Sequence, residues 1–175
     1  MAARRIAKKL NDTELWDYAL RVLARRAHSS GELKQKLKLR AQSAADVDVT
    51  LSKLREYGFA DDTKFSEAFA GARLQNQGFG KLRVLHELRA KRIAPAVAAK
   101  AVEKTFEGTD ELQLIQNFID RKYRGKNLKQ FLQEEKNLAS AYRRLRNAGF
   151  SSNGSITVLK RYSRSTDEWD AGAED

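Results

Sequence analysis

Few residues in this chain have the type and spacing that chemistry requires. Asp61 and Asp62 form an adjacent carboxylate pair, and paired carboxylates can serve as general acid and base. The same doublet lies where a helix is expected to begin, and an aspartate at a helix start accepts hydrogen bonds from the free amides of the first turn. We therefore assign the doublet to helix capping and expect no catalysis from it.

The other candidates for catalysis or cofactor binding have weaker patterns. His28 and His86 have no partner at metal-ligand spacing, so we expect both at the surface or at helix ends. The run Gly78-Phe79-Gly80-Lys81 lacks the full GxxxxGK(S/T) spacing of a phosphate loop and follows no strand, which indicates a tight turn. Since the chain has no Cys, disulfides and thiolate metal sites are excluded. The sequence predicts a protein that is not an enzyme and needs no cofactor or metal.

Charge is the strongest signal in the composition. The chain has 34 Lys and Arg residues against 23 Asp and Glu residues, a net charge of +11. Five of the acids lie in the last ten residues, so residues 1–165 hold 34 bases and 18 acids, a net charge of +16. Such a field attracts DNA, RNA or an acidic protein surface without reading a sequence. Solubility alone is the alternative explanation of this charge.

We expect the binding residues to be basic side chains on the outer faces of helices, where several of them could follow a helical polyanion or an acidic groove. The alternative is that many of them only solvate the helices or pair with acids one turn away, as Lys36 could with Glu32. The candidates are Arg21, Arg25, Arg26, Lys34, Lys38, Arg40, Arg73, Lys81, Arg89, Lys91, Arg92, Arg121, Lys122, Arg143, Arg144 and Arg146.

The elements that hold these side chains are predicted to be helices. Apolar residues recur at helical spacing over most of the chain, and there is one Pro in 175 residues. Ser29 or Ser30 is expected to cap the second helix, and Thr109 to cap the seventh. Gly58 is expected to end the third helix in the left-handed conformation, with Phe59 folded back as a hydrophobic plug. An extra segment, 126–136, interrupts the last set of helices.

These helices fall into three related sets, each with a basic helix, a turn of small residues and a further helix. A set of about 50 residues does not easily bury its own apolar face, so neighbouring sets are expected to stack. The sequence thus predicts an all-α fold, an elongated, curved array of three tandem three-helix repeats, with a single globular bundle as the alternative. The expected parts are a basic N-terminal arm (1–11), three repeats (12–59, 60–108 and 109–164) and an acidic C-terminal tail (165–175).

One stretch of the chain resembles a known family. The run GFADDTKFSEAF, then Ala72-Arg73, then GFGKLRVLHELRAKRI, is similar to the signature of the RecX family of recombinase regulators. The resemblance covers residues 15–106 well and residues 109–163 more loosely, and Arg92-Ile93 stands where that family usually has Gly-Ile. The matching motif residues are Asp61, Asp62, Phe65, Arg73, Gly80, Glu87 and Leu88, and most of them look structural.

The resemblance implies an all-helical protein that binds along the groove of the RecA filament and inhibits recombinase, ATPase and coprotease activities in DNA recombination, repair and the SOS response. The alternative is a module that binds nucleic acid directly, with Trp16, Tyr18 or Phe79 stacking on bases. No apolar run is long enough for a membrane span and no secretory signal is visible, so we expect a cytoplasmic protein. A basic monomer is the simplest expectation.

Overall fold

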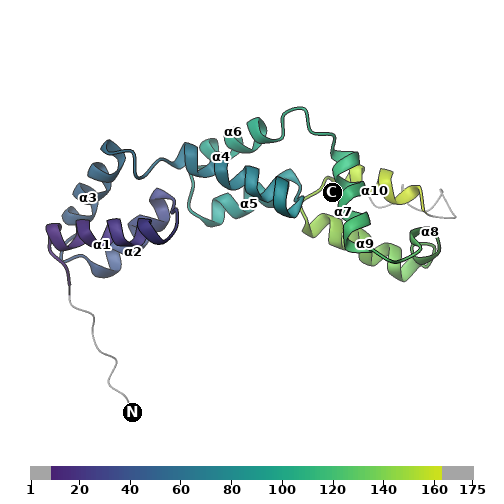
Figure 1. The fold of residues 1–175 in the computed structure, drawn as a ribbon, viewed down its shortest axis with the longest axis horizontal. Helices are drawn as coiled ribbons and strands as arrows, with labels where there is room; N and C mark the ends of the chain where they lie inside the picture. The colour runs from purple at the N-terminus through teal and green to yellow at the C-terminus, as the bar shows by residue number, and fades with distance from the viewer. Residues whose placement is uncertain (1–8, 163–175) are drawn as a thin grey trace, which may run out of the picture. The chain divides into compact units, whose positions relative to one another are not determined.

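The structure is a computed structural model that describes residues 9–162, and most of these residues are helical (Figure 1). Within this range the β-structure is limited to one isolated parallel bridge between Leu10 and Ala41. The all-α class predicted from the sequence is therefore confirmed. The helices are α1 (Asp12–Arg25), α2 (Ser30–Arg40), α3 (Ala44–Glu56), α4 (Asp62–Ala72), the π-helical turn η1 (Arg73–Gln77), α5 (Lys81–Ala90), α6 (Pro95–Thr105), α7 (Glu111–Lys122), α8 (Leu128–Phe131), α9 (Glu135–Asn147) and α10 (Ser152–Lys160).

The helices divide between two compact units, which we describe separately. Unit 1 takes its described residues from 9–68 and 88–98, and unit 2 takes them from 69–87 and 99–162. The division runs through α4, α5 and α6, so each of these helices contributes residues to both units. The proposed acidic tail and residues 1–8 of the proposed basic arm lie outside the described residues.

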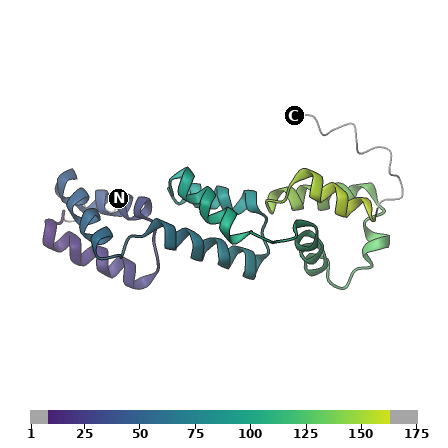
Figure 2. The ribbon, with the colours of Figure 1, turned by 90° about the horizontal axis from the view of Figure 1, so that it is seen from above.

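The core of unit 1 is built from apolar residues of α1, α2 and α3, the three helices drawn in purple to blue in Figure 2. Leu15, Leu33 and Leu51, one from each helix, are at most 1% exposed. Each of these helices begins with a reciprocal capping box, in which the cap side chain and the third helical residue satisfy each other's backbone amides. The second of these boxes is built on Ser29, one of the two serines expected to cap α2.

The chain enters unit 1 through Leu10, which the sequence places in the basic arm. Its N–H donates to the carbonyl of Arg40 at 2.7 Å, and its carbonyl accepts from the N–H of Gln42 at 3.0 Å. The Leu10 side chain is 9% exposed and belongs to the core. One apolar residue, placed between Lys9 and the cap of α1, thus holds the chain against the end of α2.

The joint after α3 differs from the prediction at Phe59. Gly58 takes the left-handed φ of 71°, and the N–H of Phe59 folds back onto the carbonyl of Leu54 at 2.8 Å, as expected. The Phe59 ring, however, is 51% exposed and stacks on Tyr57 with centroids 6.3 Å apart. Ala60 is the buried residue of this joint, at 7% exposure.

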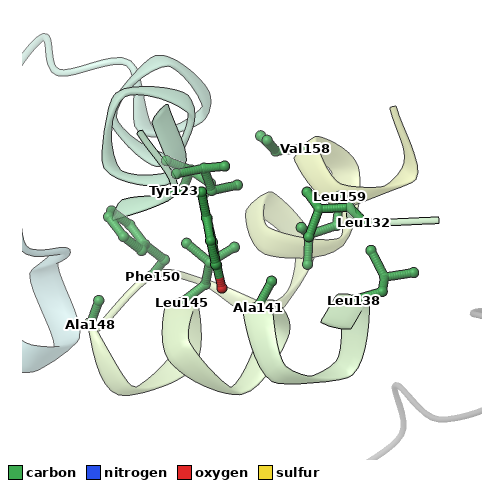
Figure 3. Packing of buried hydrophobic residues seen from close by; sticks show 11 residues of the cluster. Tyr123, Leu132, Leu138, Ala141, Leu145, Ala148, Phe150, Val158 and Leu159 are labelled. Atoms are coloured by element: carbon green, nitrogen blue, oxygen red, sulfur yellow. The ribbon is translucent and has the colours of Figure 1, made fainter. Parts of the chain in front are cut away.

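The core of unit 2 lies between α7, α9 and α10 (Figure 3). Ile115, Leu145 and Leu159 are its buried aliphatic residues from the three helices, and Phe150 packs edge-on against Phe118 at 5.5 Å. The extra segment folds as the short helix α8, and Leu132 beside it is fully buried in the same core. The prediction of Thr109 as the cap of α7 is wrong, since the side chain of Asp110 accepts from the first-turn amides.

Arg92, the departure from the family's usual Gly-Ile pair, adopts a left-handed backbone with φ of 62°. It is the one non-glycine residue in 9–162 with positive φ, a conformation that strains an L-residue. The reason is local: the N–H of Arg92 closes the end of α5 on the carbonyl of Arg89 at 2.8 Å. Pro95 then opens α6 at its first position, as expected.

Candidate functional site

Unit 1 carries a cationic groove of about 550 Å³ between the C-terminal half of α1 and the adjacent face of α2. We call it the unit-1 groove. None of the described residues that line it is acidic. Its lining residues are Leu10, Tyr18, Arg21, Val22, Arg25, Arg26, His28, Lys36 and Arg40.

Unit 2 carries a groove of the same character, about 780 Å³ in volume, which we call the unit-2 groove. It lies where α7 and α9 meet the end of η1 and the start of α5, and again none of the described residues lining it is acidic. Its cations are Arg83, Arg121, Lys122, Arg143 and Arg144, its rings are Phe79 and Phe118, and the remaining lining residues are Asn76, Gln77, Ser140, Asn147 and Ala148.

The first two helices of each three-helix set share a register that explains why the grooves look alike. In α1, α4 and α7 a buried pair of residues four apart is accompanied by an aromatic residue three positions after the first: Tyr18, Phe69 and Phe118. In α2, α5 and α9 a buried pair four apart recurs, and the residue three positions after its first member is charged: Lys36, Glu87 and Arg144. In the first and third sets this residue is a cation that lines the same groove as the ring, whereas in the second set it is an acid.

In the second set that acid, Glu87, forms ion pairs with two arginines. Glu87 Oε2 lies 2.6 Å from Arg73 Nε, and Glu87 Oε1 lies 3.0 Å from Arg83 Nε. The Arg73 guanidinium also lies 4.7 Å from the centre of the Phe69 ring. Two of the basic residues near this position are thus partnered by one carboxylate, and the π turn that begins at Arg73 brings this arginine over the ring.

Several cations in the two open grooves have no such partner. Arg25, Lys36, Lys122 and Arg143 make no hydrogen bond or ion pair with another described residue. The expected pairing of Lys36 with Glu32 is wrong, because Glu32 instead accepts from Lys91 at 3.3 Å. These four side chains are therefore available to an anionic ligand.

Other cations of the grooves hold the groove walls together. Arg83 lies over the Phe79 ring at 3.9 Å and donates to the carbonyl of Asn147 at 3.2 Å. Arg121 donates to the carbonyl of Gln77 and lies 5.7 Å from the centre of the Phe118 ring. These contacts fix guanidinium groups on aromatic surfaces, where they keep their positive charge.

His28 lies at a helix end, directly before the Ser29 cap of α2, which is one of the two expected locations, but it is buried. It is 6% exposed, lines the unit-1 groove, and its Nδ1 lies 3.5 Å from Glu32 Oε2 without hydrogen-bond geometry. Burial, aided by the charges of Arg26 and Lys36, lowers the pKa of His28 despite the opposing effect of Glu32. His28 is therefore a neutral imidazole at neutral pH.

The carboxylate of Glu32 lies beside this groove, close to Arg26, His28 and Lys91. Burial raises its pKa, but hydrogen bonds from the Ser29 amide and Lys91, together with the charges of Lys91 and Arg26, outweigh burial and lower it. The carboxylate of Glu32 therefore stays ionised and holds Lys91 away from solvent. Lys91 Nζ also lies 5.8 Å from the centre of the Phe65 ring.

The two aspartates of the doublet have different structural tasks. Asp61 caps α4, accepting from the amides of Thr63 and Lys64 at 3.0 Å each, and these hydrogen bonds lower the pKa of Asp61, the Lys64 amide contributing most. Asp62 instead reaches across to Ser30 and accepts from its N–H at 2.7 Å and from its Oγ at 2.5 Å. The capping assignment is thus correct for Asp61, and Asp62 joins the first two sets of helices within unit 1.

The remaining motif residues are structural as well. Leu88 is fully buried, Glu87 holds two arginines, and Phe65 lies beneath Lys91. Gly80 packs against the backbone of Gly149, where its N–H donates to the carbonyl of Ala148 at 2.8 Å. The Gly78-to-Lys81 run is a turn that ends η1 and leads into α5, in line with the prediction.

The predicted binding residues lie in several places. The unit-1 groove gathers Arg21, Arg25, Arg26 and Arg40, and the unit-2 groove gathers Arg121, Lys122, Arg143 and Arg144. The others lie outside the grooves, and five of them already have partners. Those five are Lys34 with Asp48, Arg73 with Glu87, Lys81 with the Phe106 ring, Lys91 with Glu32, and Arg146 with the carbonyl of Phe150. The other three, Lys38, Arg89 and Arg92, are exposed.

Three groove residues, Lys36, Arg83 and His28, are not among the binding residues predicted from the sequence. The register of the buried positions could have found Lys36, since it follows Leu33 by three residues as Arg144 follows Ala141. Nothing in the local sequence places Arg83 beside α9. The aromatic residues Trp16, Tyr18 and Phe79 are partly buried and pack against the two cores.

In the range 9–162 no cluster of His, Cys, Asp and Glu side chains is arranged to hold a metal ion. The helices of the same range are all too short or too polar to span a bilayer. The fold and the two grooves define a helical protein made of three-helix sets, with cationic grooves as its main chemical feature.

Comparison with known proteins identifies the family. A model described as "RecX, first three-helix domain" matches residues 16–54, and one described as "RecX, second three-helix domain" matches residues 61–102. A protein named regulatory protein RecX from Legionella pneumophila (strain Corby) is 34% identical over 133 residues, which cover 65% of this chain and 87% of the relative. The chain belongs to the RecX family of regulatory proteins.

Other relatives match a shorter part. Proteins named regulatory protein RecX from Chlorobium phaeobacteroides (strain BS1) and Halorhodospira halophila (strain DSM 244 / SL1) are 37% and 39% identical over 87 residues, half of this chain. The matched part spans 58% and 53% of those two relatives. A crystal structure titled RecX from Lactobacillus salivarius has the same fold, with a TM-score of 0.64 and 15% identity over 86% of this chain and 96% of that chain.

Proposed function

We propose that this protein is a non-enzymatic cytoplasmic regulator that binds in the groove of the RecA–DNA filament and inhibits recombinase, ATPase and coprotease activities. Membership of the RecX family supports the regulatory role. The observation that supports the choice of partner is the pair of cationic grooves whose described lining residues include no acid, since a RecA–DNA filament is a helical polyanion.

The proposed mode of action needs binding energy and no chemistry. Arg25, Lys36, Lys122 and Arg143 lie on helices that pack against the cores. Because their backbone is already ordered, binding to the filament costs little backbone entropy. A rigid helical protein seated in the filament groove hinders the motions between neighbouring RecA subunits that ATP turnover and strand exchange require. Inhibition then follows from occupancy alone.

The test is the DNA-dependent ATPase and strand exchange of purified RecA with stoichiometric amounts of this protein. We expect both activities to fall, and the effect to weaken as salt is raised because the contact is electrostatic. If RecA hydrolysis and strand exchange stay unchanged from low to moderate salt, the proposal is wrong.

The second candidate is a direct nucleic-acid-binding module that acts by competing for DNA. The aromatic rings next to guanidinium groups in both grooves favour it, because such surfaces suit stacked bases as well as phosphates. Pull-down of RecA with and without single-stranded DNA and nucleotide separates the two. Capture of RecA only as a filament supports the first function, and binding to DNA alone with displacement of RecA supports the second.

A further inference from the structure

We infer that the unit-1 groove and the unit-2 groove are two separate sites, each for the sugar-phosphate backbone of single-stranded nucleic acid. We also infer that Glu87 keeps the equivalent position of the second helix set from being a third site. This inference deepens the proposed function, on which it rests in taking the filament's DNA as the strand. It assigns the DNA contacts to particular residues and leaves the RecA contacts to other surfaces.

The first argument is the kind of cation in the grooves. Eight of the ten Lys and Arg residues in the two linings are arginines. The planar guanidinium donates two parallel hydrogen bonds to one phosphate and keeps its charge at any relevant pH. In each groove the free cations come from both helices, Arg25 opposite Lys36 and Lys122 opposite Arg143, so a backbone lying between the helices meets positive charge on both sides.

The second argument separates a nucleic acid from an acidic peptide. Each groove has an aromatic wall, Tyr18 in unit 1 and Phe118 in unit 2, with a guanidinium 5.4 or 5.7 Å from the ring centre. A base can stack on such a surface, whereas an aspartate or glutamate side chain gains nothing there.

The third argument comes from unsatisfied donors in the unit-1 groove. Arg40 Nε is buried and has no hydrogen-bond partner among the described residues, although its guanidinium lies over Tyr18. A buried donor without a partner costs free energy, and an anion in the groove removes that cost. His28 beside it is neutral when the groove is empty, so the groove's charge comes from its Lys and Arg residues alone.

The fourth argument is the contrast with the second set. There the charged residue of the shared register is Glu87, which pairs with Arg73 and Arg83 and leaves the ring of Phe69 covered by Arg73. The fold is the same, but Glu87 stands where the first set has Lys36, and Ala72, Asn76 and Gln77 stand where it has Arg21, Arg25 and Arg26. The open grooves are therefore not a general by-product of three-helix packing.

The experiment uses the full chain and a fluorescein-labelled 20-nucleotide oligothymidylate, with binding followed by fluorescence anisotropy as a function of salt. One double variant, R25E/K36E, reverses the free cations of the unit-1 groove, and another, K122E/R143E, reverses those of the unit-2 groove. The control double variant, K100E/K129E, makes the same change of four charge units at exposed lysines outside both grooves. Circular dichroism verifies that each variant keeps its helical content.

We expect each groove variant to bind the oligonucleotide at least tenfold more weakly at low salt and to lower the slope of log K against log salt by about 1.4, since each lost phosphate contact lowers it by about 0.7. The control should bind within threefold of the wild type. Equal weakening by the control would show that only the total charge matters and would overturn the inference. Equal affinity for a polyglutamate chain of the same charge, with the same dependence on the groove residues, would overturn it as well.

The RecA ATPase assay, run on the same variants, separates this inference from the proposed function. If the groove variants lose oligonucleotide binding and the wild-type protein does not affect RecA, the proposed function fails and the phosphate sites stand. If the wild type inhibits RecA and oligonucleotide binding is insensitive to both groove variants, the inference fails and the proposed function stands.

Discussion

Arg73 Nε lies 2.6 Å from Glu87 Oε2, and this ion pair fills in the second helix set the position that is an open cationic groove in the first and third. The two side chains are 33% and 22% exposed, so solvent screens the pair only in part. Its main effect is on charge: one carboxylate offsets half of the positive charge that Arg73 and Arg83 would otherwise present together.

Replacing Glu87 by glutamine is predicted to increase the affinity of the protein for a polyanion. E87Q frees Arg73 and Arg83 and should tighten oligothymidylate binding about threefold at low salt, with a steeper salt dependence. Because the pair is partly exposed, the cost in stability should stay near 1 kcal/mol. Anisotropy titrations check this. E107Q makes the same charge change at an exposed residue without a described partner, and an equal gain in E107Q would contradict the role of position 87.

Asp62 and Asp61 are predicted to differ in their contributions to stability. D62A removes the acceptor of two hydrogen bonds from Ser30 and should lower the free energy of unfolding by about 2 kcal/mol, since hydrogen bonds to a charged group are worth about 1.5 to 3 kcal/mol each before solvent exposure reduces them. D61A removes a helix cap and should cost about 1 kcal/mol. Urea unfolding followed by circular dichroism measures both. A larger loss in D61A would show that the Ser30 contact is unimportant.

Gly80 is predicted to tolerate no side chain. A Cβ at this position would lie 2.3 Å from the carbonyl oxygen of Gly149, a backbone atom that cannot move aside without opening the joint between α5 and α9. We expect G80A to lose about 3 kcal/mol of stability. Gly71 provides the control, because a Cβ there meets no atom within 4 Å, and G71A should gain about 1 kcal/mol from helix propensity. Thermal and urea unfolding of the two variants should move in opposite directions.

His28 is predicted to make the folded protein less stable in mild acid. Its pKa is lowered in the folded state by burial and by neighbouring cations, so the unfolded chain binds more protons as the pH falls past the usual histidine value of about 6.5. Stability should therefore decline from pH 7 to pH 5 in the wild type. H28Q should flatten this part of the profile, and H86Q, at an exposed position of α5, should keep the wild-type slope. A wild-type profile that is flat over this range would contradict the assignment.

Much of the helical framework could be predicted from the sequence, because helix boundaries depend on local signals. Serine caps, Gly58 and Pro95 each act within one turn of the chain, and the structure uses them as expected. Two local predictions were wrong because the next residue took the role. Ala60 is buried in place of Phe59, and Asp110 caps α7 in place of Thr109. Local patterns do not choose between adjacent candidates of similar chemistry.

The grooves could be predicted only in part. The sequence singles out basic residues on the outer faces of helices as candidates, yet it does not say which of them have their charge offset by an acidic partner. Lys91 is held by Glu32, 59 positions away, and Arg83 reaches Asn147, 64 positions away. Such pairings depend on the packing of different helix sets, which lies beyond any window of local sequence.

The sequence spacing of the buried positions indicates how the three helix sets are related. Leu15 and Ser66 are 51 positions apart, as are Leu33 and Val84 and also Val47 and Ala98, so the buried positions of the first two sets share one spacing without a net insertion. The third set departs from this rule: Leu15 and Ile115 are 100 positions apart, whereas Leu33 and Ala141 are 108 apart. The difference of eight residues falls between α7 and α9, where α8 lies. We read α8 as an insertion into a third duplicate, and a shortened chain that excises it is the natural starting point for reconstructing the ancestral repeat.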